Sequence, residues 1–276
     1  MRSFVPKKIL VPTDLSEASN AALANARVFM EKYGAEVTVL HAERIEVPPY
    51  FTSSQLDELA KERQTKWKEA ADYVSRSVAP LLGTVPETIV AGGAPTDLIL
   101  KTIEEKKPDL VIMGTHGRSG AQRFWMGSVT ERVIRRGGCP VLAVRAEGNP
   151  ALKRILGAIS AEDKEGVVVS TAASLATDFD ADLSLVHATG SGELPDRCPG
   201  VSEEIRKRCR IEESLARGDA AENILRVAQE VRPDIIVMGG RRWVMLFGEF
   251  FSTTTEKVMR AAATSLLVVP MKDVEE

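Results

Sequence analysis

Short apolar runs and longer amphipathic segments alternate along the chain. The apolar runs of its first part are rich in Val, Ile and Leu: KKILVP, EVTVLHA, ETIVAG, DLVIMG and PVLAVRA. The segments between them have helical periodicity, as in residues 17–33, where Ala and Leu recur on one side. Near-continuous apolar strands that alternate with helices are typical of βαβ units, in which helices cover both faces of a parallel sheet. The pattern therefore predicts an α/β fold.

The same pattern occurs twice. Residues 8–42 align without a gap with residues 154–188, and residues 92–114 align with residues 217–239. The offsets are 146 and 125, so the second copy is 21 residues shorter in its middle. Self-similarity at a fixed spacing indicates repeated structural units.

Two tandem domains follow from this repeat. We predict a first domain over residues 1–148 and a second over 149–276, joined near EGNPALK. Each is expected to be a doubly wound domain, with a five-stranded parallel sheet flanked by helices.

Composition narrows the function classes. The chain has 44% hydrophobic residues, 27% charged residues and a formal net charge of −3, which gives no electrostatic reason to expect a nucleic-acid partner. Its three cysteines form no paired framework, and its three histidines show no metal-binding spacing. No apolar run approaches the roughly 20 residues that span a bilayer. We expect no membrane partner and a reducing, cytoplasmic location.

Glycines gather after the fourth apolar run, in GTHGRSGAQRFWMGS (114–128). In an open parallel sheet the ligand crevice lies at the carboxyl ends of the strands, where Pro12-Thr13-Asp14, His41-Ala42 and Met113-Gly114 also fall. The loop ends in Gly127-Ser128-Val129-Thr130, a helix start that Ser128 or Thr130 can cap. Backbone N–H groups at such a start suit phosphate oxygens. The loop contains neither a Walker A nor a GxGxxG motif, so a plain connection remains the alternative.

These features together resemble a known family. The spacing Gly114-x2-Gly117-x9-Gly127-Ser128, with VPTDLSEAS, EVTVLHA, GGAPTDLIL and CPVLAVR in the same order, resembles the ATP-binding branch of the universal stress protein family. The resemblance covers essentially the whole chain as two tandem family domains. It implies an adenine nucleotide alpha hydrolase-like fold and a non-catalytic role in stress adaptation. The implied ligand is ATP, and whether Mg²⁺ binds with it is left open.

The resemblance also implies a nucleotide site in the first copy. Its residues are Pro12, Thr13, Asp14, Ala42, Met113, Gly114, His116, Gly117, Gly127, Ser128, Val129 and Thr130. Asp14 would accept ribose hydroxyls, although it could also serve as a helix N-cap. The backbone of Ala42 would meet the adenine edge, and Met113 and Gly114 would line the base and ribose. His116 would donate to a phosphate or be a solvated loop residue.

The second copy departs from this pattern. Asp14 corresponds to Ser160, Gly117 to Arg242 and Gly127 to Ser252, whereas Gly114 is retained as Gly239. The loop 242–251, RWVMLFGEFF, is apolar and would pack into the emptied pocket, face a partner or receive an apolar ligand. We expect the second copy not to bind ATP in the family manner.

The last strands of the copies, PVLAVRA (140–146) and SLLVVP (265–270), are expected to pair within the chain. Self-association into a homodimer is left open. Three function classes remain: an ATP-binding sensor or regulator, a slow ATPase or nucleotide-dependent transferase, and an interaction module with a vestigial site. The intact Gly/Ser spacing argues against the vestigial site, and the absence of the adenylyl-transfer signatures HIGH and SGGxDS favours the sensor over the enzyme.

Overall fold

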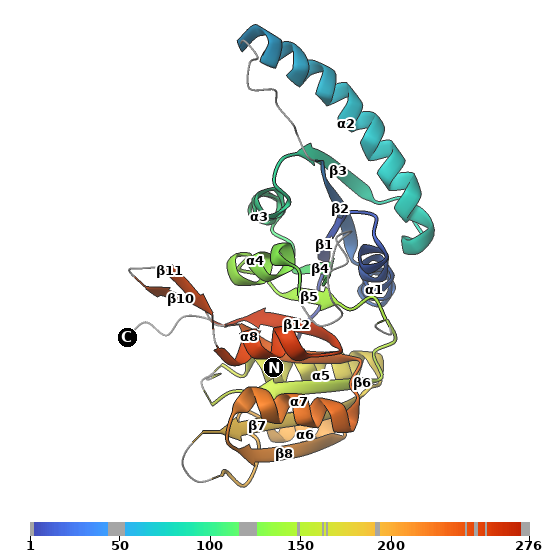
Figure 1. The fold of residues 1–276 in the computed structure, drawn as a ribbon. Coiled ribbons are helices and arrows are strands. Elements are labelled where there is room, and N and C mark those ends of the chain that lie inside the picture. The colour runs from blue at the N-terminus through green and yellow to red at the C-terminus, as the bar shows by residue number, and fades with distance from the viewer. Residues whose placement is uncertain are drawn as a thin grey trace.

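The computed structural model describes most of the chain. The described residues are 3–43, 53–115, 126–147, 150–161, 163, 165–190, 194–240, 242–245, 248–251 and 253–271, with the backbone alone at 53–65, 242–245 and 248–251. We call β1–β5 with α1–α4 the first half, and β6–β12 with α5–α8 the second half (Figure 1).

The elements alternate as the sequence predicts. Those of the first half are β1 (Lys8–Thr13), α1 (Glu17–Tyr33), β2 (Glu36–Glu43), α2 (Ser53–Leu82), β3 (Glu87–Gly92), α3 (Pro95–Lys106), β4 (Leu110–Gly114), α4 (Ser128–Arg136) and β5 (Val141–Val144). Those of the second half are β6 (Arg154–Ile159), α5 (Val167–Phe179), β7 (Asp182–Thr189), α6 (Glu203–Arg208), β8 (Ile211–Arg217), α7 (Ala220–Val231), β9 (Ile235–Gly240), β10 (Arg242–Met245), β11 (Gly248–Phe251), α8 (Thr253–Ala261) and β12 (Ser265–Pro270).

Ten of the described strands form one sheet in the order β3-β2-β1-β4-β5-β12-β9-β6-β7-β8. Each half contributes five strands to this sheet, and within each half these five are parallel. The strands follow the same order in both halves. The order reverses direction between β1 and β4 in the first half and between β6 and β9 in the second. The predicted fold class, with a five-stranded doubly wound parallel sheet in each half, is confirmed.

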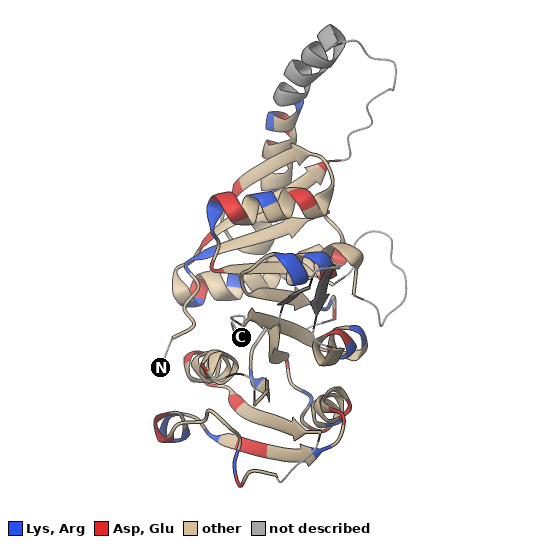
Figure 2. Ribbon diagram, turned by 90° about the vertical axis from the view of Figure 1, so that its left-hand side faces the viewer, with Lys and Arg blue, Asp and Glu red and all other residues tan. Residues whose placement is uncertain are grey.

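The halves join through antiparallel strands. In β5 and β12, Val141 pairs with Val268 and Ala143 with Leu266. Because both strands are buried and carry no charged side chain, their pairing removes two edges of unpaired backbone groups from water. Figure 2 shows that charged residues lie mostly on the helices, while the middle of the sheet is uncharged.

Helices cover both faces of the continuous sheet. One hydrophobic core lies between one face of the sheet and helices α1, α2, α5 and α6. A second core lies between the other face and helices α3, α4, α7 and α8. Each core extends across both halves. On the first face, the rings of Phe29 and Phe179 lie 5.7 Å apart, and the Tyr33 hydroxyl donates to Asp178 at 3.0 Å. On the second, Arg135 pairs with Glu256 at 3.1 Å.

The second half differs from the first in two elements. The six-residue α6 stands where the first half has the 30-residue α2, which accounts for the shorter second copy. The segment 242–251, predicted to be a loop, contains the antiparallel hairpin β10–β11 (Figure 1), so that expectation was wrong. Among the helices that the structure describes, none combines the length and apolar character needed to cross a membrane.

Candidate functional site

The predicted site lies at the carboxyl ends of β1, β2 and β4, beside the first turn of α4. Ile9 pairs with Leu110 and Leu10 with Val111, so β1 and β4 run side by side toward this edge, where Thr13 and Gly114 end the two strands. The Thr130 hydroxyl donates to the Gly114 carbonyl at 2.8 Å and fixes α4 against this edge. The sheet order reverses between β1 and β4, which is where open α/β sheets bind ligands.

The turn after β1 is held by its own side chains. Asp14 Oδ1 accepts from the backbone N–H of Ser16 at 3.1 Å and from its hydroxyl at 2.5 Å. The Ser16 side chain in turn accepts from the backbone N–H of Ser19 and caps α1. The alternative role of Asp14 as the N-cap is therefore wrong, because Ser16 takes that position. Asp14 is half-buried and supports the capping residue.

Leu15, between Asp14 and Ser16, has φ of 61°. A β-carbon makes this left-handed region unfavourable, and such strain is often found at functional sites. The sequence contained no signal for it, since glycine or asparagine would be expected at a left-handed position. Its counterpart at offset 146, Ala161, has no positive φ. The strained turn thus belongs to the first half alone among the described residues.

A histidine ring connects the ends of the first two strands in each half, β1 and β2 in the first and β6 and β7 in the second. His41 Nδ1 lies 2.8 Å from the Thr13 carbonyl, and His187 Nδ1 lies 3.0 Å from the Ile159 carbonyl. The recurrence of this contact gives both histidines a structural role. Pro12 pairs with Leu40 inside the sheet, and Ala42 lies one residue beyond the last β1–β2 pair. The main chain of Ala42 is therefore not covered by β1.

Gly114 has a structural reason to be glycine. A Cβ there would lie 2.8 Å from the backbone of Ala18 in α1, closer than real contacts allow. The recurrence of glycine at Gly239 agrees with a packing role at this position. Met113 is buried, as is its counterpart Met238, and both side chains belong to the second core. Neither residue needs a nucleotide to explain its identity.

The backbone conformation of Gly127 does not require glycine. It is the N-cap of α4 with φ of −62° and ψ of 145°, a conformation open to any residue, and no side chain caps the helix. The expectation that Ser128 or Thr130 caps α4 was wrong, because the helix begins at Ser128. The Thr130 hydroxyl is committed to Gly114, and Thr255 makes the same bond to Gly239 at 3.0 Å in the second half.

The structure brings together Pro12, Thr13, Asp14, Met113, Gly114, Gly127, Ser128, Val129 and Thr130 at this edge, with Ala42 at the end of β2. His116 and Gly117 lie outside the described residues, and their assignment stays a prediction.

The corresponding edge of the second half carries a buried carboxylate. Asp163 follows β6 and accepts from the backbone N–H groups of Val167 and Val168, each at 2.8 Å. It thereby occupies the N-terminus of α5, whereas the first half uses the neutral hydroxyl of Ser16.

Arg145, immediately after β5, was not singled out from the sequence. It is 8% exposed, and Nη2 donates to the Ala262 carbonyl at 2.5 Å, across the junction between the halves. In the part of the chain that the structure describes, Nε and Nη1 have no hydrogen-bond partner. Burial lowers the pKa of this guanidinium.

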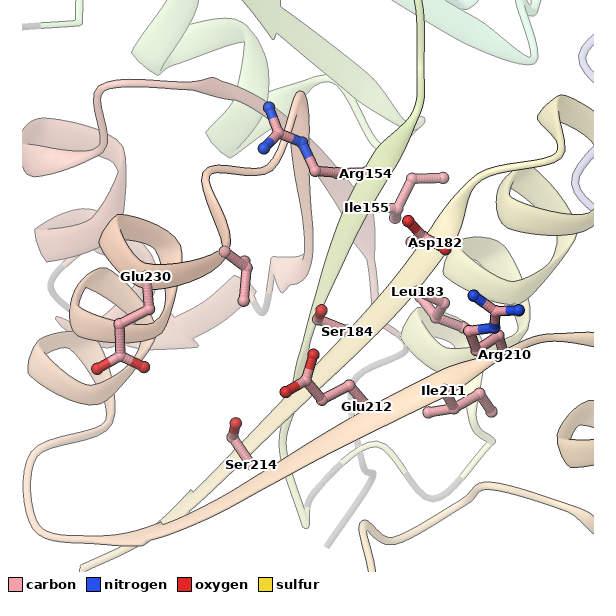
Figure 3. Close-up of a pocket in the computed structure, with 11 residues that line it drawn as sticks. Arg154, Ile155, Asp182, Leu183, Ser184, Arg210, Ile211, Glu212, Ser214 and Glu230 are labelled. Carbon is pink, nitrogen blue, oxygen red and sulfur yellow. The ribbon is translucent and has the colours of Figure 1, made fainter.

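A hollow of about 510 Å³ lies away from this edge (Figure 3). Arg154, Asp182 and Arg210 line it from the amino ends of β6, β7 and β8, and Glu230 faces them from α7. Ligand crevices of open α/β sheets lie at the opposite, carboxyl ends. Among the described residues, no group of three or more His, Cys, Asp and Glu is placed to hold a metal ion.

The fold and this edge define a class: doubly wound α/β proteins built from two similar halves. The model of the universal stress protein family matches residues 6–145 and 201–270, well over half of the sequence. The chain therefore belongs to the universal stress protein family, and the two matched segments fit a tandem arrangement.

Comparison with individual proteins also finds universal stress proteins. A universal stress protein of Methanocaldococcus jannaschii is 35% identical over 145 residues, which cover 50% of this chain and 82% of the relative. A second one from the same organism is 30% identical over 161 residues, covering 53% of this chain and 99% of the relative. The crystal structure of a universal stress protein from Archaeoglobus fulgidus matches with a TM-score of 0.71 at 21% identity, covering 98% of this chain and 99% of that one. This last likeness shows a shared fold along the whole chain.

Proposed function

We propose that the chain is a non-catalytic, ATP-binding regulator of stress adaptation, in which a first domain (1–148) holds the nucleotide and a second (149–276) does not. Asp14 would accept ribose hydroxyls and the backbone of Ala42 would meet adenine. His116, Gly117 and the residues Gly127–Thr130 would hold the phosphates, with or without Mg²⁺. We place it in the cytoplasm, with the paired halves acting as an internal dimer.

One observation carries this proposal: the contrast between two halves that fold alike. His41 and Thr130 each have a counterpart that makes the same contact in the second half, and Gly114 recurs there as Gly239. Gly127 is replaced there by serine, and neither its dihedral angles nor a side-chain cap requires glycine. Close approach of an anion to the start of α4 would explain a residue without a β-carbon at this position.

The stoichiometry of binding tests the proposal directly. Native mass spectrometry of the protein as purified, followed by titration with ATP, should show one nucleotide per chain. A chain that takes up no adenine nucleotide would refute the proposed function. Two nucleotides per chain would refute the assignment of the second half. Steady phosphate release far above that of an S128A/T130A variant would favour a slow ATPase or a nucleotide-dependent transferase.

Gly127→Val tests the phosphate contact. The φ and ψ of Gly127 are accessible to valine, so the loss of stability should be about 1 kcal/mol, the cost of a poor N-cap. Its branched side chain would nevertheless keep phosphates from the backbone, and ATP affinity by calorimetry should fall about 100-fold, as for a lost charge-assisted contact.

Gly114→Val is the matched control, because its Cβ would meet the backbone of Ala18. It should lower the melting temperature strongly, through overpacking of about 1–3 kcal/mol. If Gly127→Val instead behaved like Gly114→Val, with stability and binding lost together, the glycine would be only a structural turn.

A further inference from the structure

Arg145 is unusual among the charged residues because it is buried without full pairing. An arginine that is only 8% exposed normally has its five donors satisfied by carboxylates or carbonyls. Arg145 satisfies one donor group, Nη2, through the Ala262 carbonyl, and leaves Nε and Nη1 without a partner in the described structure. The ten residues 116–125, which follow Thr115, contain no Asp or Glu that could neutralise it.

The backbone places Arg145 beside the start of α4. The N–H of Thr115 donates to the Val144 carbonyl at 2.9 Å, and the Thr115 carbonyl accepts from the N–H of Gly127 at 2.5 Å. In a parallel ladder the N–H and C=O of one residue point toward the same neighbouring strand. Gly127 therefore lies on the β5 side of Thr115, at the place of the next β5 residue beyond Arg145.

The side chain of Arg145 lies on the same face of the sheet as α4. Val141 and Ala143 belong to the core under α4 and α8, while Leu142 and Val144 belong to the other core. Because side chains alternate along a strand, Arg145 follows Val141 and Ala143 onto the α4 face.

The hydrogen bond to the Ala262 carbonyl further defines where the Arg145 guanidinium lies. Because β5 and β12 are antiparallel and each follows its helix, α4 and α8 run antiparallel, and Arg135 meets Glu256 between them. The C-terminal end of α8, with Ala262, is thus alongside the first turn of α4. The guanidinium that reaches Ala262 lies between the two helix ends, with unpaired donors next to the N-terminus of α4.

We infer that Arg145 binds the phosphate chain of the nucleotide at the start of α4 and links that site to the second half through Ala262. This inference rests on the proposed function. A phosphate oxygen would supply the acceptors and the negative charge that the buried guanidinium lacks. The second half provides an internal comparison, since Arg145 corresponds to Pro270 at offset 125, in the copy that also lacks Gly117 and Gly127.

Arg145→Met separates this role from a purely structural one. Methionine fills similar space without charge, and it removes the cost of burying the two unpaired donor atoms, which offsets the lost bond to Ala262. We expect an unchanged or raised melting temperature, while ATP affinity falls about 10-fold to 100-fold, as for a lost charge-assisted hydrogen bond. Adenosine should bind both proteins equally. Arg132→Gln, an exposed arginine of α4, is the matched charge control and should leave ATP affinity unchanged.

The outcomes are distinct. Wild-type protein that binds no adenine nucleotide would refute the proposed function itself. Wild-type binding with equal ATP affinity in Arg145→Met would overturn the inference about Arg145 alone. If Arg145→Met does not fold, the Nε–H resonance of Arg145 in the wild-type protein gives the answer, with Arg145→Lys used to assign it. That resonance should shift on addition of ATP and not of adenosine, and an unchanged resonance in saturating ATP would overturn the inference.

Discussion

Residues that recur in both halves make the same contacts in each. Asp109 accepts from two backbone N–H groups at the start of β1, and Asp234 does so at the start of β6, all at 2.8–2.9 Å. Lys107 and Arg232 both end their helices in the left-handed conformation. These positions maintain the fold, because they persist whether or not the glycine loop is intact.

Thr130 belongs to this structural group, and its substitution tests the assignment. Thr130→Val removes a buried hydroxyl that bonds to the Gly114 carbonyl, and Thr255→Val removes the matching bond in the second half. Each should cost about 1 kcal/mol, which lowers the melting temperature by about 2–4 °C in a protein of this size. Equal losses, measured by thermal unfolding, would show that the hydroxyl serves the fold in both halves. A Thr130→Val protein with unchanged stability would contradict this.

The sequence alone predicted the importance of some residues at the candidate site and missed others. The glycine spacing led to Gly127 directly. The role of Gly114 depends on contact with Ala18, nearly 100 positions away, which no local pattern reveals. Asp14 and Ser16 are equally good N-cap types, and the φ of Leu15 decides between them. Arg145 was overlooked because an arginine after a strand is usually solvated, and its burial arises only when the second half covers it.

At the scale of elements, helices α1 and α5 join the two halves on one face. Phe29 is 1% exposed and packs on Phe179, while Tyr33 donates to Asp178. Aromatic pairs of this kind contribute about 0.5–1.5 kcal/mol beyond their buried area. The contact between these helices is therefore a substantial part of the junction, in addition to the pairing of β5 with β12.

This junction should weaken at alkaline pH through Tyr33. Burial, followed by the hydrogen bond and negative charge of Asp178, raises the pKa of Tyr33 above its ordinary value. A raised pKa in the folded state means that the stabilisation is complete below pH about 10, the unfolded value, and is lost as pH rises further.

Tyr33→Phe isolates this effect. At pH 7 it should cost about 1.5 kcal/mol, because the hydrogen bond to a carboxylate is lost. In urea unfolding, the difference in unfolding free energy between wild type and Tyr33→Phe should shrink as pH rises above about 10. A difference that stayed constant would mean that the Tyr33 pKa is not shifted by folding.

The sequence predicted those helices and strands that have a clear apolar pattern. The ten strands of the main sheet follow from runs of Val, Ile and Leu and from the repeat. The hairpin β10–β11 was missed because its aromatic and apolar residues lie in a segment interpreted as a degraded loop, and no turn motif of the Asn-Gly type marks it.

At the scale of the whole molecule, the two halves share both cores. Residues of α1 and α5 belong to one cluster, and residues of α3 and α7 to the other. Contacts that cross from one half to the other include the β5–β12 ladder, the Phe29–Phe179 pair and the bond from Arg145 to Ala262. The two hydrophobic cores are therefore continuous across the junction.

Unfolding should therefore be cooperative over the whole chain, and ATP should stabilise all of it. We expect one calorimetric transition, whose calorimetric and van't Hoff enthalpies agree. Because a ligand that binds only the folded state stabilises by RT ln(1 + [L]/Kd), ATP at about 100 times its Kd should add about 2.7 kcal/mol. That gain should move the single transition as a unit and protect amides of β6 and β9 from exchange as well as those of β1 and β4. Two transitions, of which ATP moves only the first, would show that the halves unfold independently and that nucleotide binding is not transmitted across the junction.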